Sequence, residues 1–320
     1  MRIALLGAGG WGKNLVRVFC DVLGPAAVLV CEPDATRREA ISEAHPGIEV
    51  SADNRFEDGI DAVVIAAPAA LHAALTEQAL RAGKHVLVEK PITLRSAQAE
   101  DLIRLAGERQ RILMVDHLLE YHPAVDALKA LVDEGRLGRL LHLTSQRLNL
   151  GVIRTEENAL WSLAPHDISI MLYLMNEEPE VVGAHGYAYL QPEVEDVANL
   201  TLRFPSGALG HVHVSWLDPV KTRRLTVVGD RGMAVFDDMA EAKLALFDRH
   251  AKVCEGGFCI HRGDMTPVPI AGAEPLRALA EVFLESIRTG AAPRSDGADG
   301  LRVVRVLEAA HEILQRGGGP

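Results

Sequence analysis

The chain has 320 residues, of which 48% are hydrophobic and 24% charged, and its formal net charge is -11 at pH 7. The length indicates two domains, on a prior of about 150 residues each. The acidic balance argues against a nucleic-acid surface, and the longest weakly polar stretch, residues 62–75, is too short to span a membrane. We therefore expect a cytoplasmic protein that binds neither nucleic acid nor membrane, a location that its four scattered cysteines also fit.

The first apolar run leads into a glycine-rich turn. Residues 2–6 read as a buried strand, and an amphipathic helix is predicted over 11–23. Between them Gly7, Gly9 and Gly12 form a G-x-G-x-x-G pattern, with Gly10 and Trp11 inside it. Strand, glycine turn and helix in this order suit a dinucleotide pyrophosphate, because glycines allow the tight turn and the helix N-terminus presents free N–H groups to the anion.

The next apolar run, residues 27–31, ends in Glu32, about 20 residues after Gly12. An acidic residue at this spacing is the expected partner of the adenosine ribose hydroxyls, and it repels a 2′-phosphate. NAD is therefore the predicted cofactor. NADP stays open, since Arg37 and Arg38 lie close by and are able to accommodate a phosphate.

Up to about residue 117, short apolar runs alternate with helical patterns. Strands are predicted at 2–6, 27–31, 48–50, 61–67, 85–89 and 112–116, and helices at 11–23, 36–44, 70–82 and 96–109. Such alternation indicates a parallel sheet covered by helices on both faces. The predicted fold of residues 1–120 is therefore α/β, a doubly wound Rossmann sheet that binds NAD.

Beyond residue 120 the pattern changes. A helix over 123–134 and a strand over 139–148 precede a helix that begins near His166, and helices over 275–289 and 301–316 close the chain. Between these, strands with alternating polarity are joined by tight turns at 205–207 and 229–232. Residues 121–320 are therefore expected to form an α+β domain with a large, mostly antiparallel open sheet. An uncovered sheet face often dimerises, so we expect a homodimer or homotetramer formed through it.

One lysine, Lys90, lies at a position where a ligand is expected to bind. The fifth predicted strand runs into Glu89, Lys90 and Pro91, and ligands of open parallel sheets bind outside the carboxyl ends of the strands. Lys90 is thus placed to meet a nicotinamide or a substrate. On position alone, a surface lysine at a strand end is an equally good interpretation.

Three segments together resemble the Gfo/Idh/MocA oxidoreductases, the family of glucose–fructose oxidoreductase and inositol dehydrogenase. They are the glycine turn, the segment Ala66, Ala67, Pro68 with His72, and the tripeptide Glu89, Lys90, Pro91. The resemblance implies a catalytic role for Lys90 and a cis peptide before Pro91, which X-Pro bonds permit. It also implies that Ala67, Pro68, His72 and Glu89 belong to the cofactor site.

A later segment, residues 145–151 followed by 158–168, is similar to the branch that includes nucleotide-sugar (UDP-N-acetylglucosamine-type) 3-dehydrogenases. The wider family carries an Asp-x-x-x-His element whose histidine is the acid–base residue. Here the histidine position is His166, and the aspartate position is Ser162. Asp167 is an alternative acidic partner, although a neighbouring residue on a helix points in another direction.

His166 also has a physical argument of its own. Pro165 favours the first turn of a helix, so His166 is predicted at a helix N-terminus, where the dipole disfavours imidazolium. A neutral imidazole accepts the proton of an alcohol as hydride leaves. The alternative is that His166 only caps or packs, as most of the 13 histidines must.

The predicted activity is NAD-dependent oxidation of a ring secondary hydroxyl of a sugar, most simply a nucleotide sugar at its 3-position. Lys90 would stabilise the alkoxide and His166 would act as base, and the reverse assignment stays open. Further substrate-binding candidates are His117, Tyr121, Arg147, Asn149, Arg154, Asn158 and Asp167. Alternatives are a dehydrogenase of a free sugar, inositol or another small molecule, and a non-catalytic cofactor-sensing regulator of the same fold. No metal is expected, because Cys254, Cys259 and His261 match no usual zinc spacing.

Overall fold

The computed structural model describes residues 1–56 and 59–317. The chain forms two compact units. Unit 1 comprises residues 1–121 and 273–304, and unit 2 comprises residues 122–272 and the chain from Arg305. The sequence interpretation divides the chain once, near residue 120, whereas the chain returns to unit 1 at Ala273.

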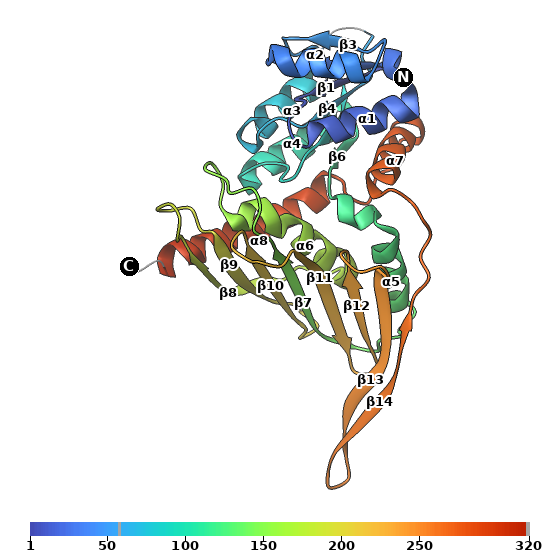
Figure 1. Cartoon of the computed structure of the whole chain (residues 1–320), viewed down its shortest axis with the longest axis vertical. Helices are drawn as coiled ribbons and strands as arrows, with labels where there is room; N and C mark the ends of the chain where they lie inside the picture. Colours follow the sequence, from blue (N-terminus) through green and yellow to red (C-terminus); the bar gives the residue numbers. More distant parts are fainter. Residues whose placement is uncertain (57–58, 318–320) are drawn as a thin grey trace. The chain divides into compact units, whose positions relative to one another are not determined.

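Unit 1 is built on a six-stranded parallel sheet with the strand order β3-β2-β1-β4-β5-β6 (Figure 1). Its strands are β1 (Ile3–Leu6), β2 (Val28–Cys31), β3 (Glu49–Ser51), β4 (Ala62–Ile65), β5 (His85–Val88) and β6 (Leu113–Val115). The inner strands are almost wholly apolar and buried, as expected for strands covered on both faces. This strand order is that of a doubly wound dinucleotide-binding sheet, and it confirms the predicted fold class.

Helices connect these strands and cover the sheet. They are α1 (Gly12–Leu23), α2 (Ala35–Ala44), α3 (His72–Arg81) and α4 (Ser96–Arg109), with short 3-10 turns at Pro25–Ala27, Ala69–Leu71 and Leu118–Tyr121. The returning segment adds α7 (Pro275–Thr289) against α1. Phe19 of α1 and Phe283 of α7 are fully buried in one hydrophobic core. Burial of these large apolar side chains explains why residues after 273 belong to unit 1. The unit boundary then falls inside α8 (Gly297–Gly317).

Unit 2 is an eight-stranded sheet with the order β14-β13-β12-β11-β7-β10-β9-β8. The strands are β7 (Leu140–Leu148), β8 (Glu180–Tyr187), β9 (Val197–Arg203), β10 (Leu209–Ser215), β11 (Thr222–Gly229), β12 (Met233–Asp237), β13 (Leu244–Cys254) and β14 (Gly257–Pro267). Only β7 and β10 pair in parallel among the described strands of this sheet. Helices α5 (Pro123–Asp133) and α6 (Ala159–Met175) lie against one face (Figure 1). The predicted mostly antiparallel open sheet is confirmed.

Helix α6 begins seven residues earlier than His166, the residue near which the sequence predicts its start. The side chain of Asn158 accepts a hydrogen bond from the backbone N–H of Trp161 and caps the helix. Pro165 and His166 therefore lie inside the helix. The prediction that His166 stands at a helix N-terminus is wrong, and the dipole argument for its neutral form no longer applies, because that field fades within the first turn.

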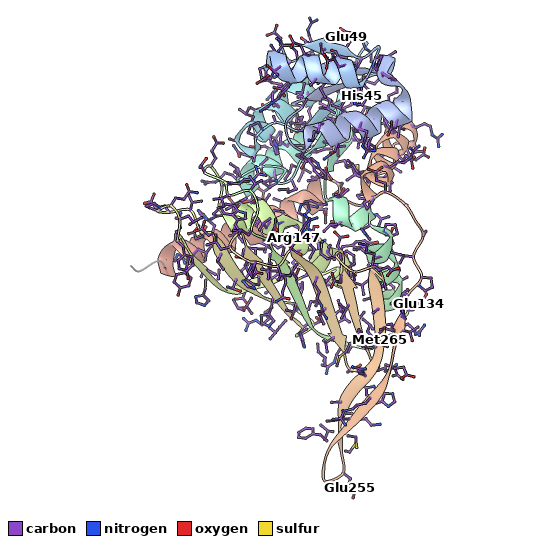
Figure 2. The ribbon with its side chains drawn as sticks, viewed as in Figure 1. His45, Glu49, Glu134, Arg147, Glu255 and Met265 are labelled. Atoms are coloured by element: carbon purple, nitrogen blue, oxygen red, sulfur yellow. A yellow bond between two sulfur atoms is a disulfide. The ribbon has the colours of Figure 1, made fainter. Side chains whose placement is uncertain are left out.

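Strands β13 and β14 form a long hairpin whose tip includes Glu255, labelled in Figure 2. Cys254 and Cys259 are joined by a disulfide bond across this tip. The sequence analysis did not predict this bond, which the hairpin turn allows by bringing the two residues to a Cα–Cα distance of 5.8 Å. Cys20 and Cys31 are buried free thiols. Within residues 1–56 and 59–317, no helix has the length and apolar character needed to cross a membrane.

Candidate functional site

The glycine turn of unit 1 has the shape that a pyrophosphate requires. Gly7 has a φ of +94°, and a Cβ atom on Gly12 would lie 2.2 Å from the carbonyl oxygen of Gly7. Around Gly10 nothing lies within 4 Å of a Cβ position, so the outer side of the turn is open. Helix α1, described over its whole length, has no side-chain cap and no acidic residue in its first turn. Its first N–H groups therefore suit an anion, and the turn fits a dinucleotide.

Glu32 lies directly beside this turn. Its carboxylate is buried, with 2% of the residue exposed, and it accepts hydrogen bonds from the backbone N–H groups of Ala8 at 2.7 Å and Asp34 at 3.0 Å. The Nη1 atom of Arg37 lies 3.6 Å from Oε1 of Glu32. Arg38 donates instead to the backbone carbonyl of Glu32 at 2.6 Å. A carboxylate held in this way is placed where an adenosine ribose is expected.

The carboxyl ends of β4 and β5 are joined by a buried histidine. Nδ1 of His72 lies 2.7 Å from the carbonyl oxygen of Pro91, and Nε2 lies 2.9 Å from that of Ala67. The peptide between Lys90 and Pro91 is cis, as the resemblance implies. His72 thus packs beneath the segments that follow both strands, and Pro68 and Lys90 are held at the same sheet edge. The resemblance implies that His72 belongs to the cofactor site, and in the structure its ring is buried.

Two carboxyl groups meet at this edge. The indole Nε1 of Trp11 donates to Oδ2 of Asp116 at 3.2 Å. Oε1 of Glu89 and Oδ1 of Asp116 are buried, and neither has another hydrogen-bond partner among the described residues. Burial, and then the neighbouring Asp116 carboxyl, raise the pKa of Glu89 well above its usual value. Glu89 therefore keeps its proton to a higher pH than an exposed glutamate does. The sequence analysis does not identify Asp116 as a site residue.

His117 and Tyr121, both predicted to bind substrate, are buried in unit 1. Nδ1 of His117 lies 2.6 Å from Oδ2 of Asp299 and 3.4 Å from Oε1 of Glu120. Burial alone would lower the pKa of His117, but hydrogen bonds to these two carboxylates outweigh it and raise the pKa to about 10. The hydroxyl of Tyr121 lies 3.1 Å from that of Ser295. Both side chains thus contact the returning segment, and their role toward a substrate stays a prediction.

The cluster of His117, Glu120 and Asp299 contains residue types that bind metals, with ligand atoms within 4.8 Å of one another. The 2.6 Å separation between His117 Nδ1 and Asp299 Oδ2 is that of a charge-assisted hydrogen bond. A proton between these two atoms accounts for it. Burial raises the pKa of Glu120 to about 7, so this cluster also carries a titratable proton.

In unit 2, Arg147 of β7 pairs with Asp167 of α6. Nε of Arg147 donates to Oδ2 of Asp167 at 2.7 Å, and Nη2 donates to Oδ1 at 3.3 Å. Ser145 also donates to this carboxylate. Both charged residues are buried. Asp167, a candidate partner of His166 and a candidate substrate ligand, thus points toward the sheet and fixes Arg147 (labelled in Figure 2).

A cavity of about 150 Å³ opens where β7 and β10 end and β11 begins. It is lined by Arg147, Leu148, Asn149, Gly151, Val152, Arg154, Ser162, Leu163, Trp216 and Arg223. Three predicted substrate residues, Arg147, Asn149 and Arg154, are therefore brought together. The fourth from this region, Asn158, is instead the cap of α6 and donates to Glu195 at 2.6 Å.

His166 lies one helical turn after Ser162 on α6, and residues four apart share a helix face. His166 therefore lies one helical turn beyond the part of α6 that lines the cavity. Lys90 belongs to unit 1 and His166 to unit 2, so their joint action stays a prediction. The sequence interpretation missed Arg223, whose proximity to Arg147 depends on sheet register.

Comparisons with known proteins agree with both units. Residues 1–117 match the model of an oxidoreductase family with an NAD-binding Rossmann fold, and residues 125–235 match the GFO/IDH/MocA C-terminal domain. The chain is 29% identical to UDP-N-acetylglucosamine 3-dehydrogenase of Acidithiobacillus ferrooxidans, over 98% of this chain and 96% of the relative. It is 30% identical to scyllo-inositol 2-dehydrogenase (NAD(+)) of Bacillus subtilis, over 72% of each.

A solved structure of the Acidithiobacillus ferrooxidans UDP-N-acetylglucosamine 3-dehydrogenase superposes with a TM-score of 0.84 at 25% identity. The match covers 99% of this chain and 98% of the other. The similarity therefore extends through both units.

The carboxyl pair generates a pH-dependent stability. Folded Glu89 keeps its proton to a higher pH than in the unfolded chain, where it titrates near 4.5. The contribution of Glu89 to the free energy of unfolding is therefore complete below pH 4.5 and is lost as the pH rises toward the folded pKa. Over that range the free energy of unfolding falls by about 1.4 kcal/mol for each increase of one in pH. In Asp116→Asn the amide donates to an ionised Glu89. We expect this variant to lose less free energy of unfolding between about pH 5 and pH 8 than the wild type.

Urea unfolding followed by circular dichroism measures this difference. The matched control is Asp264→Asn, which removes the charge of an exposed carboxylate and should leave the pH slope unchanged. Equal slopes in the wild type and in Asp116→Asn would contradict the role of Asp116 in raising the pKa of Glu89.

Proposed function

The chain belongs to the Gfo/Idh/MocA family of NAD(P)-dependent oxidoreductases that act on CH–OH groups, and we propose that it oxidises a ring secondary hydroxyl of a nucleotide sugar at its 3-position. The observation that carries the substrate class is the cavity of unit 2, which three arginines line. Such a cavity suits a substrate with negative charge. A free sugar or an inositol has no charge for these side chains to bind.

Two residues are proposed to carry out the chemistry. Oxidation of an alcohol requires a base for the hydroxyl proton and a cation beside the developing alkoxide. NAD, when bound, accepts the hydride. We assign the alkoxide and the proton relay to Lys90, at the carboxyl end of β5, and the base to His166 on α6. Support comes from the position of Lys90 at the ligand-binding edge of the sheet and of His166 one turn beyond the cavity residue Ser162.

NAD is the proposed cofactor rather than NADP. The carboxylate of Glu32 lies beside the glycine turn, where it accepts from ribose hydroxyls and repels a 2′-phosphate. Arg37 is close to that carboxylate and is already neutralised by it. We therefore expect a lower dissociation constant for NAD than for NADP by fluorescence titration. In Glu32→Gln, with the charge removed, the ratio of the two constants should move toward one. Tighter binding of NADP to the wild type would overturn the assignment.

Turnover tests the proposed activity directly. The protein is incubated with NAD and a panel of UDP-sugars and free sugars, and reduced nicotinamide is measured. We expect activity with a UDP-sugar, and losses of about 10²–10⁴-fold in kcat for His166→Ala and Lys90→Met, because acid–base groups contribute that much. Both variants should still bind NAD. Near-normal kcat in either variant would exclude the corresponding role.

Silence across the whole panel, with NAD demonstrably bound, would instead favour a cofactor-sensing regulator. Mass spectrometry of a ligand that co-purifies with the protein distinguishes this outcome from a substrate missing from the panel.

The protein is also proposed to assemble through the sheet of unit 2, as a homodimer or homotetramer. Helices α5 and α6 lie against one face (Figure 1), and along β10 the side chains alternate between buried and half-buried positions. Light scattering should report a mass of at least two chains. A monomer at micromolar concentration would contradict this proposal.

A further inference from the structure

Two arginines face one another across neighbouring strands of unit 2. Arg147 of β7 and Arg223 of β11 are direct partners in the antiparallel register. Side chains at such positions have Cβ atoms about 4.5–5.5 Å apart, and like charges there destabilise a sheet. Arg154, from the segment between β7 and α6, lines the same cavity. Three guanidinium groups thus converge on one small space.

The neighbouring carboxylates do not neutralise these arginines equally. Asp167 binds Arg147 through two hydrogen bonds, and Nε of Arg154 lies 3.1 Å from Oε1 of Glu157. Nη1 of Arg223 lies 3.8 Å from Oδ2 of Asp238, which exceeds the length of a direct hydrogen bond. None of the three carboxylates lines the cavity.

Asp238 is moreover shared. Its Oδ1 lies 3.7 Å from Nε2 of His122 and 3.9 Å from Nζ of Lys243. Burial and the positive charge of Arg147 lower the pKa of Arg223, and the carboxylates of Asp238 and Asp167 offset this only in part. Arg223 is therefore the guanidinium of this cavity with the least compensated charge.

We propose that Arg223, with Arg154, binds the phosphate or diphosphate group of the substrate, while Arg147 is held in place by Asp167. This assignment deepens the proposed function and rests on it only in taking the anion to be part of a nucleotide sugar. An anion bound by Arg223 would offset the repulsion between Arg223 and Arg147. Guanidinium groups also match phosphate oxygens in a bidentate geometry.

The size of the cavity agrees with this assignment. Sites that enclose a whole small molecule have volumes of about 300–1,000 Å³, whereas this cavity measures about 150 Å³. It therefore suits one charged group of a larger ligand. Asn149 and Ser162 add neutral donors to its wall.

Binding of inorganic pyrophosphate to the full-length protein tests the proposal. The protein is first saturated with NAD, so that the glycine turn is occupied, and affinity is measured by calorimetry. We expect Arg223→Met to weaken pyrophosphate binding by about 10-fold or more, because hydrogen bonds between charged groups strengthen binding by at least that factor. The matched control is Arg224→Met, which removes the same charge from the next residue of β11, whose side chain is exposed.

Pyrophosphate binding that is lost in Arg223→Met and kept in Arg224→Met supports the proposal. Equal losses in the two variants would reveal only long-range electrostatics and would overturn it, as would no binding to the wild type or no loss in Arg223→Met. If Arg223→Met does not fold, judged by circular dichroism, Arg223→Lys replaces it. Arg223→Lys keeps the positive charge but lacks the planar guanidinium that makes two parallel hydrogen bonds. Wild-type affinity for pyrophosphate in this variant would overturn the bidentate contact.

The outcome is separable from that of the proposed function. Loss of pyrophosphate binding in Arg223→Met without turnover of any nucleotide sugar would leave the anion site standing and refute the substrate. Turnover of a nucleotide sugar with an unchanged KM in Arg223→Met would support the substrate and refute the anion site.

Discussion

The buried ion pair between Arg147 and Asp167 is the contact on which the geometry of unit 2 depends. Two charges removed from water are tolerated only when they are paired and further hydrogen-bonded, and Ser145 supplies the additional bond. Asp167 must therefore face β7, and this requirement fixes the rotation of α6 about its axis. Ser162 then lines the cavity and His166 follows it by one turn. The same pair holds the guanidinium of Arg147 opposite Arg223.

Much of unit 1 was predictable because its signals are local. Strand, glycine turn and first helix occupy one continuous stretch, and Gly7 and Gly12 of the pattern each have a steric reason in the structure. The clash that a Cβ on Gly12 would make with Gly7 involves residues five positions apart. The sheet followed from the alternation of apolar runs with helical patterns. By contrast, α7 joins unit 1 through contacts with α1. The sequence pattern of α7 itself does not show which unit the helix packs against.

The site in unit 2 was predicted less well, since it depends on register and on competition between helix starts. Pro165 normally marks a first turn, but Asn158 provides an earlier cap. The longer helix accepts an internal proline, at a cost of about 3 kcal/mol, because its added first turns bury apolar residues such as Leu160 and Trp161. Arg223 approaches Arg147 only through the pairing of β7 with β11. A spacing rule within one segment cannot detect such a pair.

The two units use different physics to recognise a ligand. At the glycine turn the binding groups are backbone N–H groups, so the requirement on the sequence is the absence of side chains at a few positions. In the cavity of unit 2 the groups proposed to bind the substrate are long cationic side chains on strand ends and a connecting segment. Exchanging Arg223 or Arg154 changes the charge of the cavity without moving β7, since Asp167 holds Arg147 independently of both. If the proposed anion site is correct, single substitutions in this cavity change the preferred charge of the substrate and leave the dinucleotide-binding fold intact.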